Sequence, residues 1–155
     1  MSGTIESRLA ELGITLPVAA TPVANYAPFM QTGNQLFISG QVPMGPDGLQ
    51  FKGKLGADLS LEDGQAAARL CAMNLLAQAR AALGGDLERV VRLVKIVGFV
   101  NSTPDYEDQP KVVNGASDFF VEVLGDKGRH ARSAVSAAAL PLGVAVEVEA
   151  IFEVA

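Results

Sequence analysis

The sequence predicts an α+β domain in which two long helices cover one face of a mixed, mainly antiparallel sheet. Segments 61–83 and 110–125 have helical periodicity and alternate with apolar, strand-like runs. Two further strand-like runs, 131–139 and 144–154, then close the chain. The length of 155 residues suits one domain. We therefore expect residues 1–155 to form a single unit, in which residues 1–25 are an N-terminal helix and extended segment.

The first elements are short. Residues 4–12 have a helical pattern that Gly13 ends, and an extended segment rich in Pro and Ala follows over 16–28. Residues 29–32 and 36–39 flank Gly33-Asn34-Gln35, which predicts a hairpin with a short loop. A second turn is expected at Gly45-Pro46-Asp47-Gly48.

The first long helix has the clearest boundaries. Ser60 is suited to cap its N-terminus, and Gly84-Gly85 ends it. Its apolar stripe is expected to comprise Ala66, Leu70, Met73, Leu76 and Ala77.

The second half of the chain continues with a strand over 90–100, which Thr103-Pro104-Asp105 breaks. Pro110 suits the first turn of the second long helix, and Gly125 ends that helix. Leu140-Pro141-Leu142-Gly143 separates the two terminal strands.

Composition and net charge favour some properties of the protein and disfavour others. Hydrophobic residues make up 49% and charged residues 19%, which favours a surface partly covered in an oligomer. The net charge of −5, without a basic run, disfavours nucleic-acid binding. No apolar stretch is long enough to span a membrane, and no signal peptide is recognisable. A single cysteine fits a reducing cytoplasm.

The terminal strands carry charges within otherwise apolar runs. Arg132 is suited either to hold a planar carboxylate or to form a salt bridge at a subunit interface. Strict alternation over 144–154 places Glu147 and Glu149 on one face of their strand, opposite an apolar face. His130 lies two residues before Arg132, so the two side chains are expected on the same side. We expect His130 either to exchange a proton near the ligand or to bond a backbone carbonyl in a loop.

Between residues 26 and 154 the chain carries a series of short motifs: Tyr26, Ser39-Gly40-Gln41-Val42-Pro43, Gly98-Phe99-Val100, Val113-Asn114, Phe119-Phe120, Ala131-Arg132-Ser133, Leu140-Pro141 and residues 146–151. Together these motifs resemble those of the Rid (reactive intermediate deaminase) or YjgF family. The resemblance implies a chorismate-mutase-like fold, a homotrimer, and ligand clefts between subunits. It also implies hydrolysis of 2-imino and enamino acids to 2-oxo acids and ammonia, without a metal or organic cofactor.

The same resemblance implies the roles of individual residues. Arg132 would hold the substrate carboxylate, Glu147 would activate water, and Ser39 would bond the substrate amine or carboxylate. Glu147 has the alternative of facing solvent or a polar channel. The residues expected to contact the substrate are Tyr26, Gly40, Asn114, Ala134 and His130, of which His130 is proposed from its spacing alone.

Two departures from the family pattern indicate a divergent branch. Ala134 stands where many deaminating members have a cysteine, and the chain has an N-terminal extension over 4–17. These departures leave a second hypothesis open, in which the same cleft binds a small carboxylate or 2-oxo acid without turnover. Ribonuclease activity is a third hypothesis, which the net charge of −5 and the single histidine disfavour. With one His and one Cys, no typical zinc site is expected.

Overall fold

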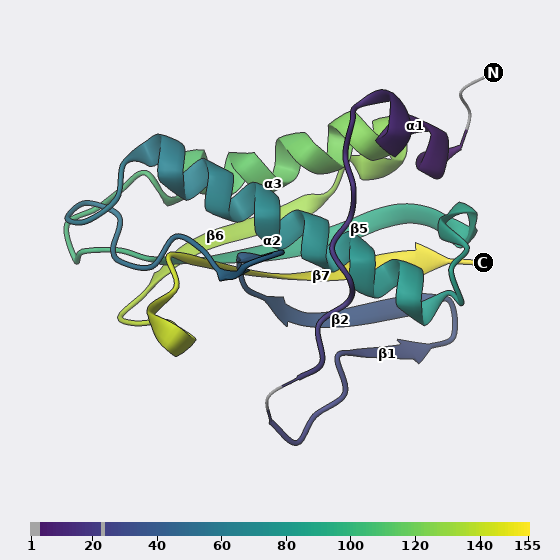
Figure 1. Ribbon diagram of the computed structural model, residues 1–155, viewed down its shortest axis with the longest axis horizontal. Helices are drawn as coiled ribbons and strands as arrows, with labels where there is room; N and C mark the ends of the chain where they lie inside the picture. The colour runs from purple at the N-terminus through teal and green to yellow at the C-terminus, as the bar shows by residue number, and fades with distance from the viewer. Residues whose placement is uncertain (1–3, 23) are drawn as a thin grey trace.

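The computed structural model describes residues 4–22 and 24–155, so Met1–Gly3 and Val23 of the predicted N-terminal region lie outside the described residues. A five-stranded sheet has the order β1-β2-β7-β5-β6, and α2 and α3 cover one of its faces (Figure 1). The strands and helices are β1 (Phe29–Thr32), β2 (Gln35–Gln41), β5 (Val90–Asn101), β6 (Ala131–Ala137), β7 (Val146–Val154), α1 (Ile5–Glu11), α2 (Leu61–Ala82) and α3 (Gln109–Leu124). The predicted α+β architecture is confirmed.

The sheet is mixed and mainly antiparallel, as predicted. Strands β5 and β6 are parallel, whereas the other neighbouring pairs are antiparallel. The turn at Gly45–Gly48 joins two short strands, β3 (Met44–Gly45) and β4 (Gly48–Leu49), which form a separate ribbon. The terminal strands are shorter than predicted because residues 141–143 form a tight 3-10 turn, in which Leu142 has a positive φ of 63°.

Helix α2 begins as the sequence indicates. The Ser60 hydroxyl accepts a hydrogen bond from the Asp63 N–H, and the Asp63 carboxylate accepts one from the Ser60 N–H, which forms a capping box. The predicted apolar stripe was partly wrong, since Ala66 is exposed and Leu70 and Met73 are only half-buried. The helix packs against both the sheet and α3, so it buries a wider face that includes Ala67, Ala68, Cys71, Ala72, Leu75, Leu76 and Ala79.

Helices α2 and α3 are in close backbone contact at Gly115. A Cβ atom at this position would overlap the backbone of Gln65 on α2. Because a backbone group cannot rotate away as a side chain can, only glycine allows this helix separation. The small side chains along α2 and Gly115 on α3 therefore set how tightly the helical layer closes over the sheet.

Gly115→Ala is expected to lower the free energy of unfolding by about 1–2 kcal/mol. Alanine favours a helix by about 1 kcal/mol over glycine, but overpacking of this contact costs more. Urea denaturation measures the change. The exposed Asp118→Ala on the same helix is the control, with an expected change within about 0.5 kcal/mol. A Gly115→Ala protein as stable as the wild type would show that the helices separate without cost.

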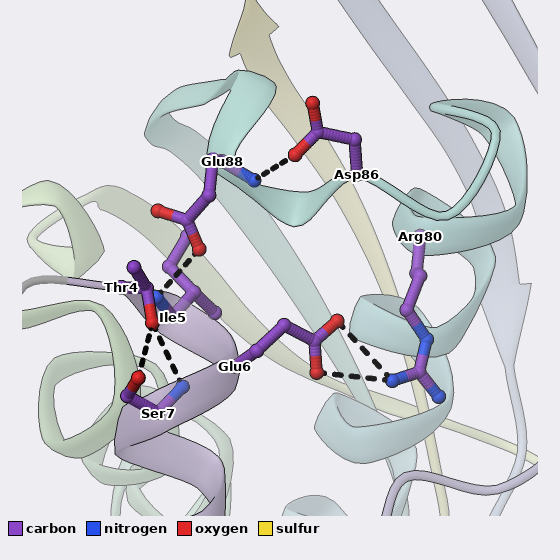
Figure 2. Close-up of polar contacts among 7 residues, drawn as sticks. All are labelled: Thr4, Ile5, Glu6, Ser7, Arg80, Asp86 and Glu88. Carbon is purple, nitrogen blue, oxygen red and sulfur yellow. Dashed lines mark hydrogen bonds and ion pairs between the residues drawn. The ribbon is translucent and has the colours of Figure 1, made fainter.

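Helix α1 is fastened beside the helical layer by polar contacts (Figure 2). The Glu88 carboxylate accepts a hydrogen bond of 2.7 Å from the N–H of Ile5, one of the free donors at the helix start. Glu6 forms an ion pair of 3.3 Å with Arg80 on α2, and the Thr4 hydroxyl caps the helix. The N-terminal extension is therefore docked on the α2 and α3 side of the protein.

The opposite face of the sheet is not covered by any described helix (Figure 1), and we call it the open face. It carries apolar side chains that are half-buried or exposed, interspersed with the glutamates of β7. Phe37 and Val135 are 40% and 45% exposed. A sheet face with this much exposed apolar surface is typical of a surface that another chain covers.

Candidate functional site

The predicted site residues form two groups, one on each face of the sheet. Arg132 on β6 is paired with Ile96 on β5, which is paired with Ala150 on β7. Because Ile96 and Ala150 are buried beneath the helices, Arg132 lies on the helix-covered face of the sheet. Glu147 pairs with Phe99, three residues further along β5, and therefore lies on the open face. We call the first group, around Arg132, the arginine group, and the second, around Glu147, the glutamate group.

Arg132 is held by hydrogen bonds to α3. Its Nη1 donates to Asn114 Oδ1 at 2.9 Å and to Ser117 Oγ at 3.2 Å, and its Nη2 donates to the Pro110 carbonyl at 3.1 Å. A guanidinium has five N–H donors, so the Nε–H and one Nη2–H have no partner among the described residues. No carboxylate among those residues lies within 4 Å of it either. Arg132 thus has a fixed orientation and two free donors.

His130 belongs to the arginine group, as its spacing from Arg132 predicts. Its Nε2 lies 2.9 Å from Ser117 Oγ, and its Nδ1 lies 2.6 Å from the Gly128 carbonyl. Because the carbonyl only accepts, Nδ1 carries a proton and donates to it. His130 thus bonds a backbone carbonyl, as one of the two hypotheses expects, and also contacts the serine that orients Arg132. Proton exchange near a ligand stays a prediction.

Glu147 lies over the backbone of Gly40 in β2. The pairing of β2 with β7 is irregular between Ile38 and Gln41, and a Cβ atom at Gly40 would overlap the Glu147 carboxylate. The lack of a side chain at Gly40 lets this carboxylate lie against the β2 backbone, whereas the close approach of a ligand to Gly40 stays a prediction. The described residues offer Glu147 neither an ion pair nor a hydrogen-bond partner for its carboxylate within the usual distances.

A pocket of about 350 Å³ adjoins the glutamate group. Its wall is mostly apolar, and Glu147 is the one charged side chain among the described residues that line it. Tyr26 and Gly40 also line this pocket. Their contact with a substrate stays a prediction. A hollow of about 410 Å³ between α1 and the end of α3 contains none of the predicted site residues.

Ser39 and Ala134 are not among the residues that line the pocket beside Glu147. The Ser39 hydroxyl donates to the Ala27 carbonyl at 3.2 Å, which ties the segment bearing Tyr26 to β2. The pocket wall does not include the Ser39 side chain, so direct contact with a substrate stays a prediction. Ala134 is half-buried on the same side of β6 as Arg132 and packs against the core.

Arg132 and Glu147 do not face a common cavity within the chain. Side-chain direction alternates along each strand, and the strand register assigns the two residues to opposite faces. The cleft between subunits that the family resemblance implies stays a prediction. The alternation along β7 was itself predicted correctly, with Val146, Val148, Ala150 and Phe152 buried.

Two residues of the site were missed in the sequence. Ser117 contacts both Arg132 and His130, and its position three residues after Asn114 on α3 was a usable signal, because residues so spaced share a helix face. Gln78, which is 1% exposed, lines the pocket from α2. An amide within an apolar helical pattern signals a buried hydrogen bond.

Partial burial raises the pKa of the Glu147 carboxyl above its ordinary value, and the negative charge of Glu149 raises it further. The folded state then holds the proton more tightly than the unfolded state. The contribution of Glu147 to the free energy of unfolding consequently decreases as pH rises from the ordinary Glu pKa through the raised one.

Glu149→Gln is therefore expected to lower the pKa of Glu147 and to make the decrease in stability with pH smaller. A carboxyl ¹³C NMR titration of Glu147 measures the first effect, and thermal unfolding between about pH 4 and pH 8 measures the second. Glu153→Gln, on the same strand face, is the control and should leave the titration unchanged. An identical titration in Glu149→Gln would show that the neighbouring charge has no influence.

Among the residues that the structure describes, no group of three or more His, Cys, Asp or Glu side chains gathers in a way that could hold a metal ion. The described helices also include none with the length and apolar character that crossing a bilayer requires.

Comparison with known proteins decides the family. The family model described as "YjgF/chorismate_mutase-like, putative endoribonuclease" matches residues 6–154. The chain belongs to the YjgF family. It is 50% identical over 153 residues to the protein TCP17 of Trypanosoma cruzi, covering 98% of this chain and 95% of that protein.

Two solved YjgF-like structures are similar along nearly the whole chain. The protein Atu1372 of Agrobacterium tumefaciens, described as of unknown function, is 50% identical with a TM-score of 0.91, covering 97% of this chain and 92% of that one. A "putative endoribonuclease" of Shewanella oneidensis is 36% identical with a TM-score of 0.94, covering 97% and 99%.

YjgF-family structures named RidA or TdcF are more distant. RidA of a Psychrobacter species is 30% identical with a TM-score of 0.61, covering 90% of this chain and 98% of that one. Escherichia coli TdcF with bound serine is 26% identical with a TM-score of 0.60, covering 90% and 94%. The large difference in TM-score agrees with the divergent branch that the sequence indicated.

Proposed function

We propose that this protein hydrolyses reactive 2-imino acids, and their enamino tautomers, to 2-oxo acids and ammonia. Water adds to the imine carbon, and the carbon–nitrogen bond then breaks, with the nitrogen leaving as ammonia. The observation that carries the proposal is Arg132, a cation oriented by three hydrogen bonds that keeps two free N–H donors. Two donors from one guanidinium suit the two oxygens of a substrate carboxylate.

The two groups of residues support a site shared between subunits. Arg132 is a cation without an acidic partner, and Glu147 is an acid without a basic one among the described residues. They lie on opposite faces of one sheet, so subunit association offers a way to bring Arg132 of one copy near Glu147 of the next. The apolar open face supports such association, and we propose the homotrimer that the family resemblance implies.

In this arrangement each residue has a defined task. Arg132 fixes the substrate carboxylate, which holds the imine carbon at one place. Glu147, whose pKa is raised by partial burial, accepts a proton from the attacking water. The half-buried backbone at Gly40 and the ring of Tyr26 border the same space. The serine bound to Escherichia coli TdcF supports the choice of an amino-acid-like carboxylate.

Competition with semicarbazide tests the activity. An L-amino-acid oxidase generates 2-iminopropanoate, semicarbazide traps it, and an active hydrolase lowers the amount trapped. Wild-type protein should lower trapping in proportion to its concentration. Size-exclusion chromatography with light scattering should give a mass about three times the 16.1 kDa of one chain. Unchanged trapping at every protein concentration would exclude the deaminase, and a monomeric mass would exclude the shared site.

Ala134 favours one alternative, in which the cleft binds a 2-oxo acid without turnover. That alternative predicts thermal stabilisation by pyruvate together with no effect on trapping. The family description names a third activity, cleavage of RNA. The net charge of −5 opposes binding of a polyanion. Absence of RNA cleavage, and of RNA binding at low salt, would remove this possibility.

A further inference from the structure

The extended N-terminal segment between α1 and β1 forms part of the pocket wall. We call residues 16–22 and 24–28 the arm. Figure 1 shows the arm leaving α1, passing across α2 and reaching the end of the sheet where β1 begins. Ala20, Pro22 and Tyr26 of the arm line the 350 Å³ pocket, opposite Met44 and Leu142. The pocket therefore exists only while the arm lies against the rest of the domain.

Two amides one turn apart on α2 fasten the walls of this pocket. Gln78 Nε2 donates to the Ala20 carbonyl of the arm at 2.8 Å. Asn74 Nδ2 donates to the Met44 carbonyl at 2.9 Å. Both side chains are almost fully buried, with 1% and 2% exposure. Because a buried amide without a partner is costly, these bonds hold the arm and the opposite wall at a set separation.

The polar groups of the pocket are largely engaged with the protein itself. Gln78 Nε2 also donates to Gln41 Oε1 at 3.4 Å, and Gln41 Nε2 donates to the Ser39 carbonyl at 3.0 Å. The surface left for a ligand between the arm and Leu142 is therefore mainly apolar, with Glu147 as its one charge among the described lining residues. Leu142 is 59% exposed and has a positive φ, an unusual conformation that keeps an apolar side chain at the pocket.

We infer that the arm determines which substrate side chains the site accepts. Gln78 is the positioning residue that holds the arm, and the pocket that they enclose receives the side chain of the substrate. The inference rests on the proposed imine hydrolysis. An imino acid with a branched apolar side chain fills this space, whereas the methyl group of 2-iminopropanoate leaves most of it empty. An acidic side chain on the substrate is repelled by the negative charge of Glu147.

Rates on two imines test the inference. Wild-type kcat/KM for the imine made from leucine should exceed that for the imine made from alanine by about tenfold or more, the usual scale for filling an apolar pocket. Gln78→Met keeps the volume but removes both hydrogen bonds, which releases the arm. We expect the leucine-to-alanine rate ratio to fall by about fivefold or more, mainly through KM for the leucine-derived imine.

The ratio distinguishes specificity from mere stability. A purely structural role for Gln78 would reduce the amount of folded enzyme, which lowers both rates by the same factor and leaves the ratio unchanged. The control is Gln31→Met, since Gln31 also donates one hydrogen bond to a backbone carbonyl, that of Gly33, but lies on β1 away from the pocket. This variant should keep the wild-type ratio.

A second variant serves if Gln78→Met does not fold. Pro22→Gly loosens the arm without a change in the core, and Pro46→Gly in the exposed β3–β4 turn is its control. We expect Pro22→Gly to lower the leucine-to-alanine ratio and Pro46→Gly to leave it unchanged. Equal loss of both rates in both arm variants, or a wild type that favours the alanine-derived imine, would overturn the role of the arm.

A failure of the deaminase proposal can be distinguished from a failure of the proposal on the arm. If the wild type accelerates neither imine, deaminase activity fails, and thermal stabilisation by 2-oxo acids then judges the arm. Stronger stabilisation by 4-methyl-2-oxopentanoate than by pyruvate, lost in Gln78→Met, would support the arm as the specificity element of a binding site. Equal stabilisation by the two acids would overturn it.

Discussion

Arg132→Met is expected to lower kcat/KM for 2-iminopropanoate by about 10²- to 10³-fold, which corresponds to roughly 3–4 kcal/mol of transition-state stabilisation. Methionine keeps much of the side-chain length but removes the charge and both free donors. Arg132→Lys should have an intermediate effect, because it restores the charge without the planar fork. Steady-state rates in the semicarbazide assay measure both variants.

A neighbouring arginine provides the control for this prediction. Arg129 precedes Arg132 by three residues, and its side chain is 71% exposed in an ion pair with Asp126. Arg129→Met removes the same charge from the same region of the chain and should leave kcat/KM within about twofold. If Arg132→Met retained wild-type activity while folded, the guanidinium would have no part in binding the substrate, and the deaminase proposal would lose its main support.

Glu147→Gln is expected to lower kcat by about 10²- to 10⁴-fold, the usual contribution of a general base. The amide has nearly the same shape and keeps the contact with Gly40, but it cannot accept a proton from water. The thermal unfolding temperature near neutral pH should stay the same or rise. The reason is that ionisation of Glu147, with its raised pKa, opposes folding at that pH, and glutamine removes this cost.

The combination of lost activity and undiminished stability is the decisive result, because a general disruption of the strand would lower both. Glu153→Gln exchanges the same atoms on the same face of β7 and should leave kcat near the wild-type value. In the wild type, kcat should rise with pH as Glu147 ionises, and this limb should disappear in Glu147→Gln. An active Glu147→Gln protein would require a different group to activate water.

Helix and strand boundaries followed largely from local sequence signals. Ser60 began α2 and Gly125 ended α3, because capping and glycine conformation depend on residues within one or two turns. The alternation along β7 likewise assigned the burial of each side chain correctly. The apolar stripe predicted through Ala66 was partly wrong because α2 packs against both the sheet and α3. The periodicity of the α2 sequence alone does not specify where these two partners lie.

The amino-acid sequence by itself thus determined the α+β class, most element boundaries, and the family to which the chain belongs. Only the tertiary structure decided that Arg132 and Glu147 lie on opposite faces of the sheet, that Ser117 orients the arginine, and that Gln78 holds the arm at the pocket. Alternation along one strand specifies the relative direction of its own side chains. Which face of the sheet those side chains reach depends on the pairing of the strand with residues far away in sequence. The hydrogen bonds of Ser117 and Gln78 likewise form only when distant segments of the chain meet.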